Sequence, residues 1–134
     1  MKLLLDNDLS FRIAHSLHAI VAAERHEVVA LREKFDPATT DEEWISALGR
    51  EGRWAVLSGN VRIARNAAER AAWRRTDLVG FFLPRSWRKL RVHQQAAHLL
   101  LWWPRLVEQY GLVRGAALFE LPVRPSSKLR QLNF

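Results

Sequence analysis

The sequence contains no cysteine and no long hydrophobic run. Without thiols the chain can form neither a disulfide nor a cysteine-ligated zinc site, and we expect it in a reducing compartment, the cytoplasm. Asp6 and Asp8 interrupt the N-terminal leucines, so we expect no signal peptide. The later run AAHLLLWW is too short to cross a bilayer. These absences argue against a membrane partner.

Acidic residues are scarce in the second part of the chain. Residues 61–134 carry 14 Lys and Arg against 4 Asp and Glu, whereas residues 1–60 carry 7 against 10. With a net charge of +7, a basic region beside an acidic one indicates nucleic acid first. A solvated basic face, or a surface for an acidic protein, would give the same composition.

Short apolar runs alternate with segments of helical periodicity along 134 residues, a length that fits one domain over residues 1–134. We predict strands at 2–5, 26–31, 54–58 and 78–84, and helices at 10–24, 41–52, 61–75 and 87–110. Strands separated by helices imply right-handed crossovers. The predicted fold class is therefore α/β: a three-layer α/β/α sandwich with a mostly parallel central sheet.

Prolines interrupt three other segments, one within the predicted core at residues 1–85 and two beyond it. The segment 33–40 contains Pro37 and is predicted to be a loop. Pro104 should kink the long helical segment 86–115 or split it in two. The segment 116–134 contains two prolines and should form an edge strand or a flexible tail.

Acidic and amide residues follow the predicted strands where these end. In a parallel sheet the carboxyl ends of the strands lie at one edge, and such folds bind their ligands there. One group follows the first strand, one follows the third, and one starts the helix reached from the second. Their members are Asp6, Asp8, Asp41, Glu42, Glu43 and Asn60. We therefore expect these side chains to gather at one edge of the sheet.

A gathered set of carboxylates indicates a metal site, because like charges repel unless a cation neutralises them. Oxygen ligands without cysteine suit Mg²⁺ or Mn²⁺, and such ions can activate water for attack on a phosphodiester. Arg12, Arg62 and Arg65 are the candidates to hold an RNA backbone beside the acids. The plainer alternative is that residues 6–8 turn the chain and that residues 41–43 stabilise a helix dipole.

The segments LLLDNDLS and DEEWISALGREGRWAVLSGN resemble the PIN-domain superfamily, in particular the small PIN-like group that contains toxin ribonucleases of bacterial toxin–antitoxin pairs. The resemblance covers residues 1–85 well and the rest poorly. By position, it implies that Asp6 is the first metal-binding acid and Asp41 the acid at the later helix start. The turn at 58–60 matches a Thr/Ser-x-Asp turn, and Asp8, Glu42 and Glu43 are the weaker candidates for a supporting carboxylate.

The resemblance implies a metal-dependent endoribonuclease that uses Mg²⁺ or Mn²⁺ in the cytoplasm. The implied partners are an RNA substrate, a cognate antitoxin protein and, in a homodimer, a second copy of the chain. Asp6, Asp41 and position 60 would be the catalytic positions, but Asn60 stands where the pattern has Asp. An amide keeps a carbonyl oxygen for a metal but loses the charge, so ion affinity and catalysis should both fall.

Two explanations of Asn60 compete: a naturally weak or inactive protein, and a toxic enzyme disarmed by one Asp→Asn change. We favour the second as a hypothesis, because the exchange is isosteric at the one position that breaks the pattern. Two non-enzymatic functions also stay open. One is a module that binds nucleic acid through its arginines, and the other is a protein-interaction domain whose acids only cap helices.

Six tryptophans are many for a chain of this length. Those at positions 44, 54 and 73 are expected to pack in the core or at its border. Those at positions 87, 102 and 103 lie in the basic half, where they could stack on bases. A packing surface or a protein-partner surface is the more common use of such a cluster.

Overall fold

The computed structural model describes residues 1–60 and 65–133. Within these ranges the strands form one sheet in the order β2-β1-β3-β4-β5-β6, parallel from β2 to β5 and antiparallel between β5 and β6. The strands are β1 (Lys2–Leu5), β2 (Glu27–Ala30), β3 (Trp54–Ser58), β4 (Val79–Phe82), β5 (Ala117–Glu120) and β6 (Arg130–Leu132). The predicted α/β class with a mostly parallel sheet is confirmed.

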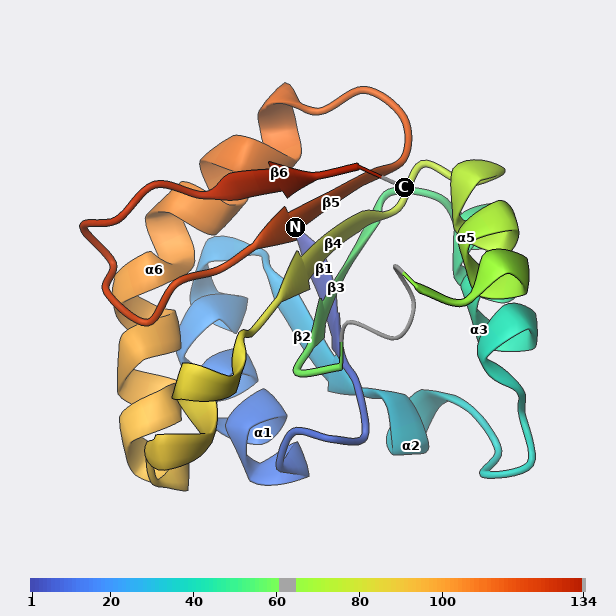
Figure 1. Ribbon diagram of the computed structural model, residues 1–134. Helices are drawn as coiled ribbons and strands as arrows, with labels where there is room; N and C mark the ends of the chain where they lie inside the picture. Colours follow the sequence, from blue (N-terminus) through green and yellow to red (C-terminus); the bar gives the residue numbers. More distant parts are fainter. Residues whose placement is uncertain (61–64, 134) are drawn as a thin grey trace.

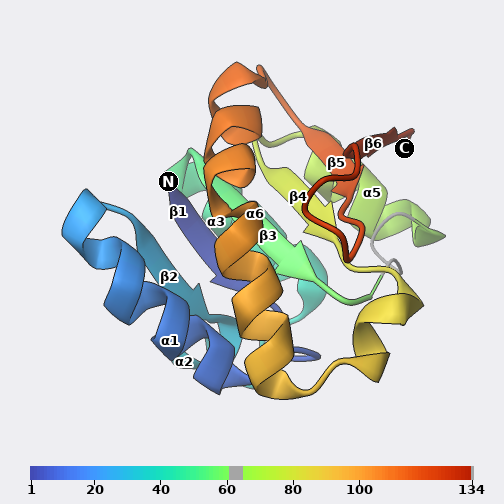
Figure 2. The ribbon, with the colours of Figure 1, turned by 90° about the vertical axis from the view of Figure 1, so that its left-hand side faces the viewer.

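Helices cover both faces of this sheet (Figures 1 and 2). On one face lie α1 (Phe11–Val21) and α6 (Val92–Leu112), and on the other lie α3 (Asp41–Glu51) and α5 (Ala67–Arg74). The shorter helical segments are η1 (Ala22–Glu24), α2 (Leu31–Lys34) and η2 (Arg85–Lys89). This arrangement is the three-layer sandwich that the alternating pattern predicted.

Two apolar clusters fill the space between the layers. Leu3 and Leu5 of β1 belong to the cluster under α1 and α6, whereas Leu4 belongs to the cluster under α3 and α5. Successive strand residues point to opposite faces, so a strand covered on both sides needs an unbroken apolar run. This requirement explains the runs KLLL and WAVLS, and every residue of β3 is buried.

Two predicted boundaries need correction. The predicted loop at 33–40 overlaps the single turn of α2, whose four residues are too few to show a helical period. Within the range 61–75, which was predicted to be one helix, the described residues form the helix α5, which starts after Asn66. The Asn66 side chain accepts the Glu69 N–H at 3.0 Å and caps the helix. Positions 61–64 lie outside the described residues.

Pro104 does not split the long C-terminal helix, because α6 runs through it as one element of 21 residues. Pro104 is exposed, so water can bind the carbonyl group that loses its N–H partner. Leu99, Trp102 and Leu106 of the same helix are buried against the sheet. In the part of the chain that the structure describes, no helix is long and apolar enough to cross a membrane.

The segment 116–134 contributes two strands, of which only the second lies at the edge of the sheet. β5 is paired with both β4 and β6, and β6 is the antiparallel edge strand. Arg130 of β6 pairs with Glu120 of β5 at 2.7 Å. The Arg105 guanidinium of α6 donates to the carbonyl groups of Pro125 and Ser127 and holds the connection between these strands.

Candidate active site

The site is built where β1 and β3 end side by side. Leu5 is paired with Leu57 in the parallel register, and the Asp6 N–H donates to the Leu57 carbonyl at 2.9 Å. The next residue of β3, Ser58, is fully buried, and its hydroxyl donates to Asp6 Oδ2 at 2.9 Å. The Asn7 N–H donates to Asp6 Oδ1 at 2.7 Å. Both carboxylate oxygens of Asp6 are therefore held in fixed positions.

The turn Ser58-Gly59-Asn60 closes on the same hydroxyl. The Asn60 N–H donates to Ser58 Oγ at 3.0 Å, so the serine links the turn to Asp6. Gly59 lies against the other acid of the first strand end. A Cβ atom at position 59 would stand only 2.7 Å from Asp8 Oδ2, closer than carbon and oxygen can approach. Glycine at this position therefore lets the Asp8 carboxylate lie against the turn without moving, a role that the sequence alone did not show.

The groups around Asp8 shift the pKa of its carboxyl group. The pKa of its carboxyl group is raised, first by desolvation from the atoms packed against the carboxyl group and second by the negative charge of Asp6, although the residue as a whole is exposed. The Gly59 N–H, which bonds to this carboxylate, and the positive charge of Arg88 act in the opposite direction. Two carboxylates that repel each other are a common feature of functional sites.

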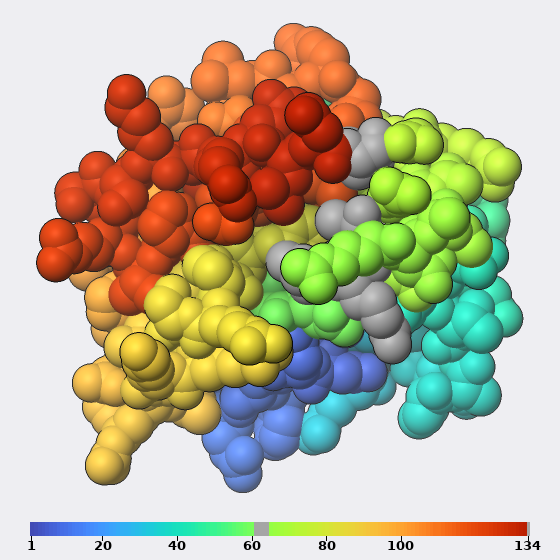
Figure 3. Space-filling model, in the orientation of Figure 1, coloured from blue at the N-terminus to red at the C-terminus, as the bar shows by residue number. Residues whose placement is uncertain are grey.

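Arg88 is an exposed positive charge that acts on Asp8 and that sequence reasoning did not select. It belongs to η2, which follows β4, and β4 lies next to β3 in the sheet. In Figure 3 the segment after β4 (yellow) lies beside the end of β1 (blue) and the end of β3 (green) on one face of the molecule. No local pattern connects Arg88 with Asp8, because their proximity depends on the strand order.

The start of α3 borders this edge but uses its first acid locally. Asn7, Thr39 and Trp44 line one small hollow, which places the beginning of α3 beside the end of β1. The Thr40 side chain accepts the Glu43 N–H at 3.2 Å and caps the helix. The Asp41 carboxylate accepts a hydrogen bond from the buried Trp44 indole at 2.9 Å. Asp41 therefore has at least one structural role, as the acceptor for the Trp44 indole.

Glu42 and Glu43 face elsewhere. Both are exposed and line a second hollow on the flank of α3, together with Ser46 and Arg50. Among the residues that the structure describes, no group of three or more His, Cys, Asp or Glu side chains could hold a metal ion. The acids that it does bring together are Asp6 and Asp8, beside a turn whose third residue is an amide.

The predicted RNA-binding arginines fall in three different situations. Arg12 is exposed, with its guanidinium carbon 4.8 Å from the centre of the Phe11 ring. Arg65 is exposed just before the cap of α5. Arg62 lies outside the described residues. Arg32, which sequence reasoning did not select, lies over the same Phe11 ring at 3.9 Å.

The donors at this edge fit a hard divalent cation. Mg²⁺ is usually held by one or two carboxylates and keeps several water ligands, so a complete cage of protein ligands is not required. Asp6 and Asp8 supply two carboxylates whose mutual repulsion a cation would relieve. The set offers oxygen ligands only, which disfavours metals that prefer sulfur or imidazole.

Comparison with known proteins gives one family. Residues 1–85 match the model of a family described as a PIN like domain. The match begins before β1 and ends just after β4, so it includes Asp6, Asp8 and the turn at 58–60 but not Arg88. No curated protein and no solved structure matches the chain.

Proposed function

The chain belongs to the PIN-like domain family, and on that premise we propose that it is an endoribonuclease dependent on Mg²⁺ or Mn²⁺, the toxin of a toxin–antitoxin pair, weakened by Asn60. PIN domains are generally nucleases, which gives the broad class of hydrolase. The observation that carries the proposal is the Asp6–Asp8 pair, held against the turn at 58–60 by Ser58 and Gly59.

Asp6 and Asp8 are the residues that would hold the metal ion, and Asp41 stands at the border of the site. The ion, when bound, would supply an activated water and neutralise charge that develops on the phosphodiester. The Ser58 hydroxyl orients Asp6 through the 2.9 Å hydrogen bond. Arg88, whose positive charge acts on Asp8, would attract the substrate phosphate, which the two carboxylates alone would repel.

In this proposal, Asn60 is the reason why the site has two carboxylates, those of Asp6 and Asp8, and not three. An Asp at this position would add a carboxylate to the turn whose backbone already bonds to Ser58 Oγ. The added charge should raise the affinity for the ion, because Asp6 and Asp8 then share it with a third ligand. The substitution Asn60→Asp is nearly isosteric and leaves the backbone hydrogen bonds of the turn in place.

The test is an RNA cleavage assay with Mn²⁺ that compares three proteins: the chain as it stands, Asn60→Asp, and Asn60→Asp combined with Asp6→Ala. We expect only Asn60→Asp to cut, and we expect chelation of Mn²⁺ to stop it. Mn²⁺ should also raise the melting temperature of Asn60→Asp more than that of the unchanged chain. If none of the three proteins cuts RNA, the nuclease proposal is wrong.

The toxin role predicts a biological difference between the same variants. Expression of Asn60→Asp in the cytoplasm should arrest bacterial growth, whereas expression of the unchanged chain should not. A cognate antitoxin should relieve the arrest, and gel filtration would show whether the chain forms the homodimer we also propose. Growth that Asn60→Asp leaves unaffected, despite cleavage in the test tube, would count against the toxin role alone.

A second candidate function is a module that binds nucleic acid without cutting it. It is favoured by the net charge of +7 and by the exposed arginines at positions 12, 32 and 65. RNA affinity that falls with salt and ignores divalent ions would support this function. A protein-interaction domain is favoured by the capping by Thr40 and by the Asp41–Trp44 hydrogen bond, which give the acids at α3 a structural use.

A further inference from the structure

The guanidinium groups of two arginines from different helices lie over the same aromatic ring, at the border of the acidic site. The guanidinium carbon of Arg12 lies 4.8 Å from the centre of the Phe11 ring, and that of Arg32 lies 3.9 Å from it. Arg12 and Phe11 belong to the first turn of α1, whereas Arg32 belongs to α2, the turn that follows β2. Both arginines are exposed, so their outer sides face solvent.

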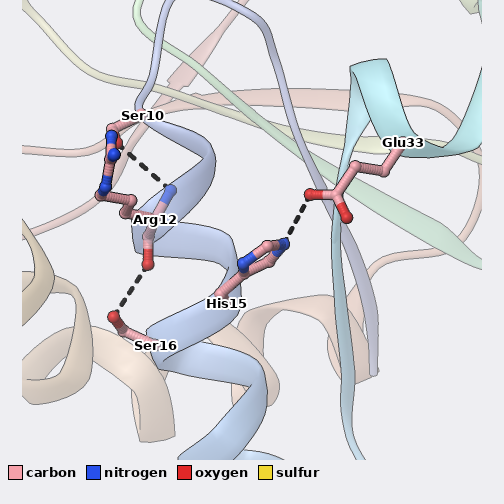
Figure 4. Close-up of polar contacts among 5 residues, drawn as sticks. All are labelled: Ser10, Arg12, His15, Ser16 and Glu33. Atoms are coloured by element: carbon pink, nitrogen blue, oxygen red, sulfur yellow. Dashed lines mark hydrogen bonds and ion pairs between the residues drawn. The ribbon is translucent and has the colours of Figure 1, made fainter.

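The neighbouring acids are engaged with other partners. Glu33, the residue next to Arg32, accepts a hydrogen bond from His15 Nε2 at 2.6 Å (Figure 4). Asp36 Oδ1 accepts the Ala38 N–H at 2.8 Å. Among the described residues, neither arginine forms an ion pair with an acid. Two guanidinium groups therefore lie over this ring without an ion-pair partner among the described residues.

This arginine pair adjoins the candidate active site. Arg32 and Asn7 line the same small hollow, and the Asn7 N–H bonds to Asp6 at 2.7 Å. Ser10, whose side chain accepts the Arg12 N–H at 3.2 Å, caps α1 directly after the acidic segment (Figure 4). A polyanion that reaches the acids would pass over or beside these two guanidinium groups.

We propose that Arg12 and Arg32 form a phosphate-binding subsite that holds a single-stranded RNA beside Asp6 and Asp8. The proposal rests on the proposed function and deepens it, because it says where the substrate backbone binds. A guanidinium group matches the oxygen atoms of a phosphate with two parallel hydrogen bonds. Two such groups on one ring can contact neighbouring phosphates of one strand, without the groove geometry of a duplex.

Phe11 has the role of a platform in this subsite. Long arginine side chains lose conformational freedom when they bind a ligand, and that loss weakens binding. Contact with the face of the ring holds both guanidinium groups in place beforehand. Leu at position 11 would retain apolar packing at the start of α1 but would remove the ring that orders the arginines.

The test measures the binding of a fluorescently labelled single-stranded RNA of about 12 nucleotides by anisotropy, in EDTA so that no cleavage occurs. Arg12→Gln and Arg32→Gln are compared with Arg50→Gln, a control that removes one positive charge from the exposed last turn of α3. Affinity falls as salt rises, and loss of one phosphate contact should make the slope of log affinity against log salt shallower by about 0.7. This change corresponds to an about fourfold lower affinity at 0.15 M salt. Arg50→Gln should leave both quantities nearly unchanged, and Phe11→Leu should weaken binding although it changes no charge.

The outcomes separate this proposal from the nuclease proposal. If Arg12→Gln and Arg32→Gln bind RNA as well as Arg50→Gln does, the subsite is wrong, even if Asn60→Asp cleaves RNA. If both variants lose affinity while Asn60→Asp fails to cleave, the subsite stands as a binding site and the nuclease proposal fails. If the unchanged chain does not bind RNA at all, the subsite is wrong. Melting curves would show that each variant is folded.

Discussion

Gly59 limits how closely the turn after β3 can approach Asp8. A methyl group there would meet the carboxylate oxygen at 2.7 Å, but that oxygen is the end of a side chain that can rotate away. We therefore expect Gly59→Ala to change the free energy of unfolding by less than about 1 kcal/mol. In the Asn60→Asp background it should lower the rate of RNA cleavage about tenfold or more, because the Asp8 carboxylate leaves its position.

Gly111 of α6 provides the matched control for this substitution. A Cβ atom at position 111 would meet nothing within 4 Å. Ala is a better helix former than Gly, so Gly111→Ala, in the last turn of α6, should stabilise the fold by up to about 0.5 kcal/mol and leave cleavage unchanged. Urea unfolding and the cleavage assay measure both quantities. Equal effects of the two substitutions on cleavage would contradict the role that we give to Gly59.

Glu51 makes stability depend on pH. Partial burial by itself would raise the pKa of its carboxyl group, but Lys34 at 3.1 Å and the Trp54 indole at 3.2 Å hold that pKa below its ordinary value. A lowered pKa stabilises the fold above the unfolded-state pKa, and this contribution disappears as the pH falls through the folded-state value. Because the Glu51 side chain is 44% exposed, solvent screening keeps the effect small.

Glu51→Gln should therefore lower the melting temperature by about 1–2 °C at pH 7. The difference from the unchanged chain should shrink as the solution is acidified below the ordinary carboxyl pKa near 4.5. Melting curves recorded by circular dichroism at a series of pH values measure this. A difference that stays constant down to acid pH would show that lost packing, and not the charge, explains the change.

Single residues were predictable from the sequence where their partners are local. Asp6 follows a strand and Asp41 starts a helix, and both positions follow from patterns within a few residues. Arg32, Gly59 and Arg88 were missed because each acts on a residue that only the folded chain brings near. Their roles depend on strand order and on helix placement, which no short segment of sequence encodes.

At the scale of the element, the cap of α3 connects helix stability with the site. Thr40 Oγ1 accepts the Glu43 N–H at 3.2 Å, and the next residue, Asp41, bonds to Trp44. Thr40→Ala should lower the free energy of unfolding by about 1 kcal/mol. Thr39→Ala, one residue earlier and outside the capping position, should change it by less than about 0.5 kcal/mol. Urea denaturation separates the two, and equal losses would contradict the capping role.

Elements with a strong local signal were predicted well, and short ones were not. The apolar runs of β1 and β3 and the capped periodicity of α1 and α3 identified four elements close to their observed bounds. α2 was missed because a single turn has no period and its preceding residue, Ala30, makes no side-chain cap. The two C-terminal strands were not resolved in advance, because they are short and separated by two prolines.

At the scale of the whole molecule, the family match ends before the fold is complete. Residues 1–85 contain the acidic edge, yet one core cluster needs Leu99, Trp102 and Leu106 of α6. The Trp87 and Trp102 indoles donate to the carbonyl groups of residues 121 and 122 at 2.8 and 2.9 Å. These tryptophans are therefore packing residues, and β5 and α6 complete the sheet and its cover.

A chain cut after residue 85 should therefore fail to fold cooperatively. It would expose the apolar face of β1 and β3 that α6 covers and the edge of β4 that β5 pairs with. We expect a broad thermal transition and strong binding of a hydrophobic dye, whereas the full chain should show a sharp transition and weak binding. A sharp transition of the shorter chain would mean that residues 86–134 are dispensable for folding.

Because of its hydrogen bond to Asp41, Trp44 should also report binding at the candidate site through its fluorescence. Indole fluorescence responds to the charge and polarity around the ring, and this indole donates directly to a carboxylate at the border of the candidate site. A cation or a nucleic acid that displaces the Asp41 carboxylate would change the emission of Trp44. Subtracting the spectrum of Trp44→Phe would isolate that signal from the other tryptophans, so binding at this edge could be followed in an unlabelled protein.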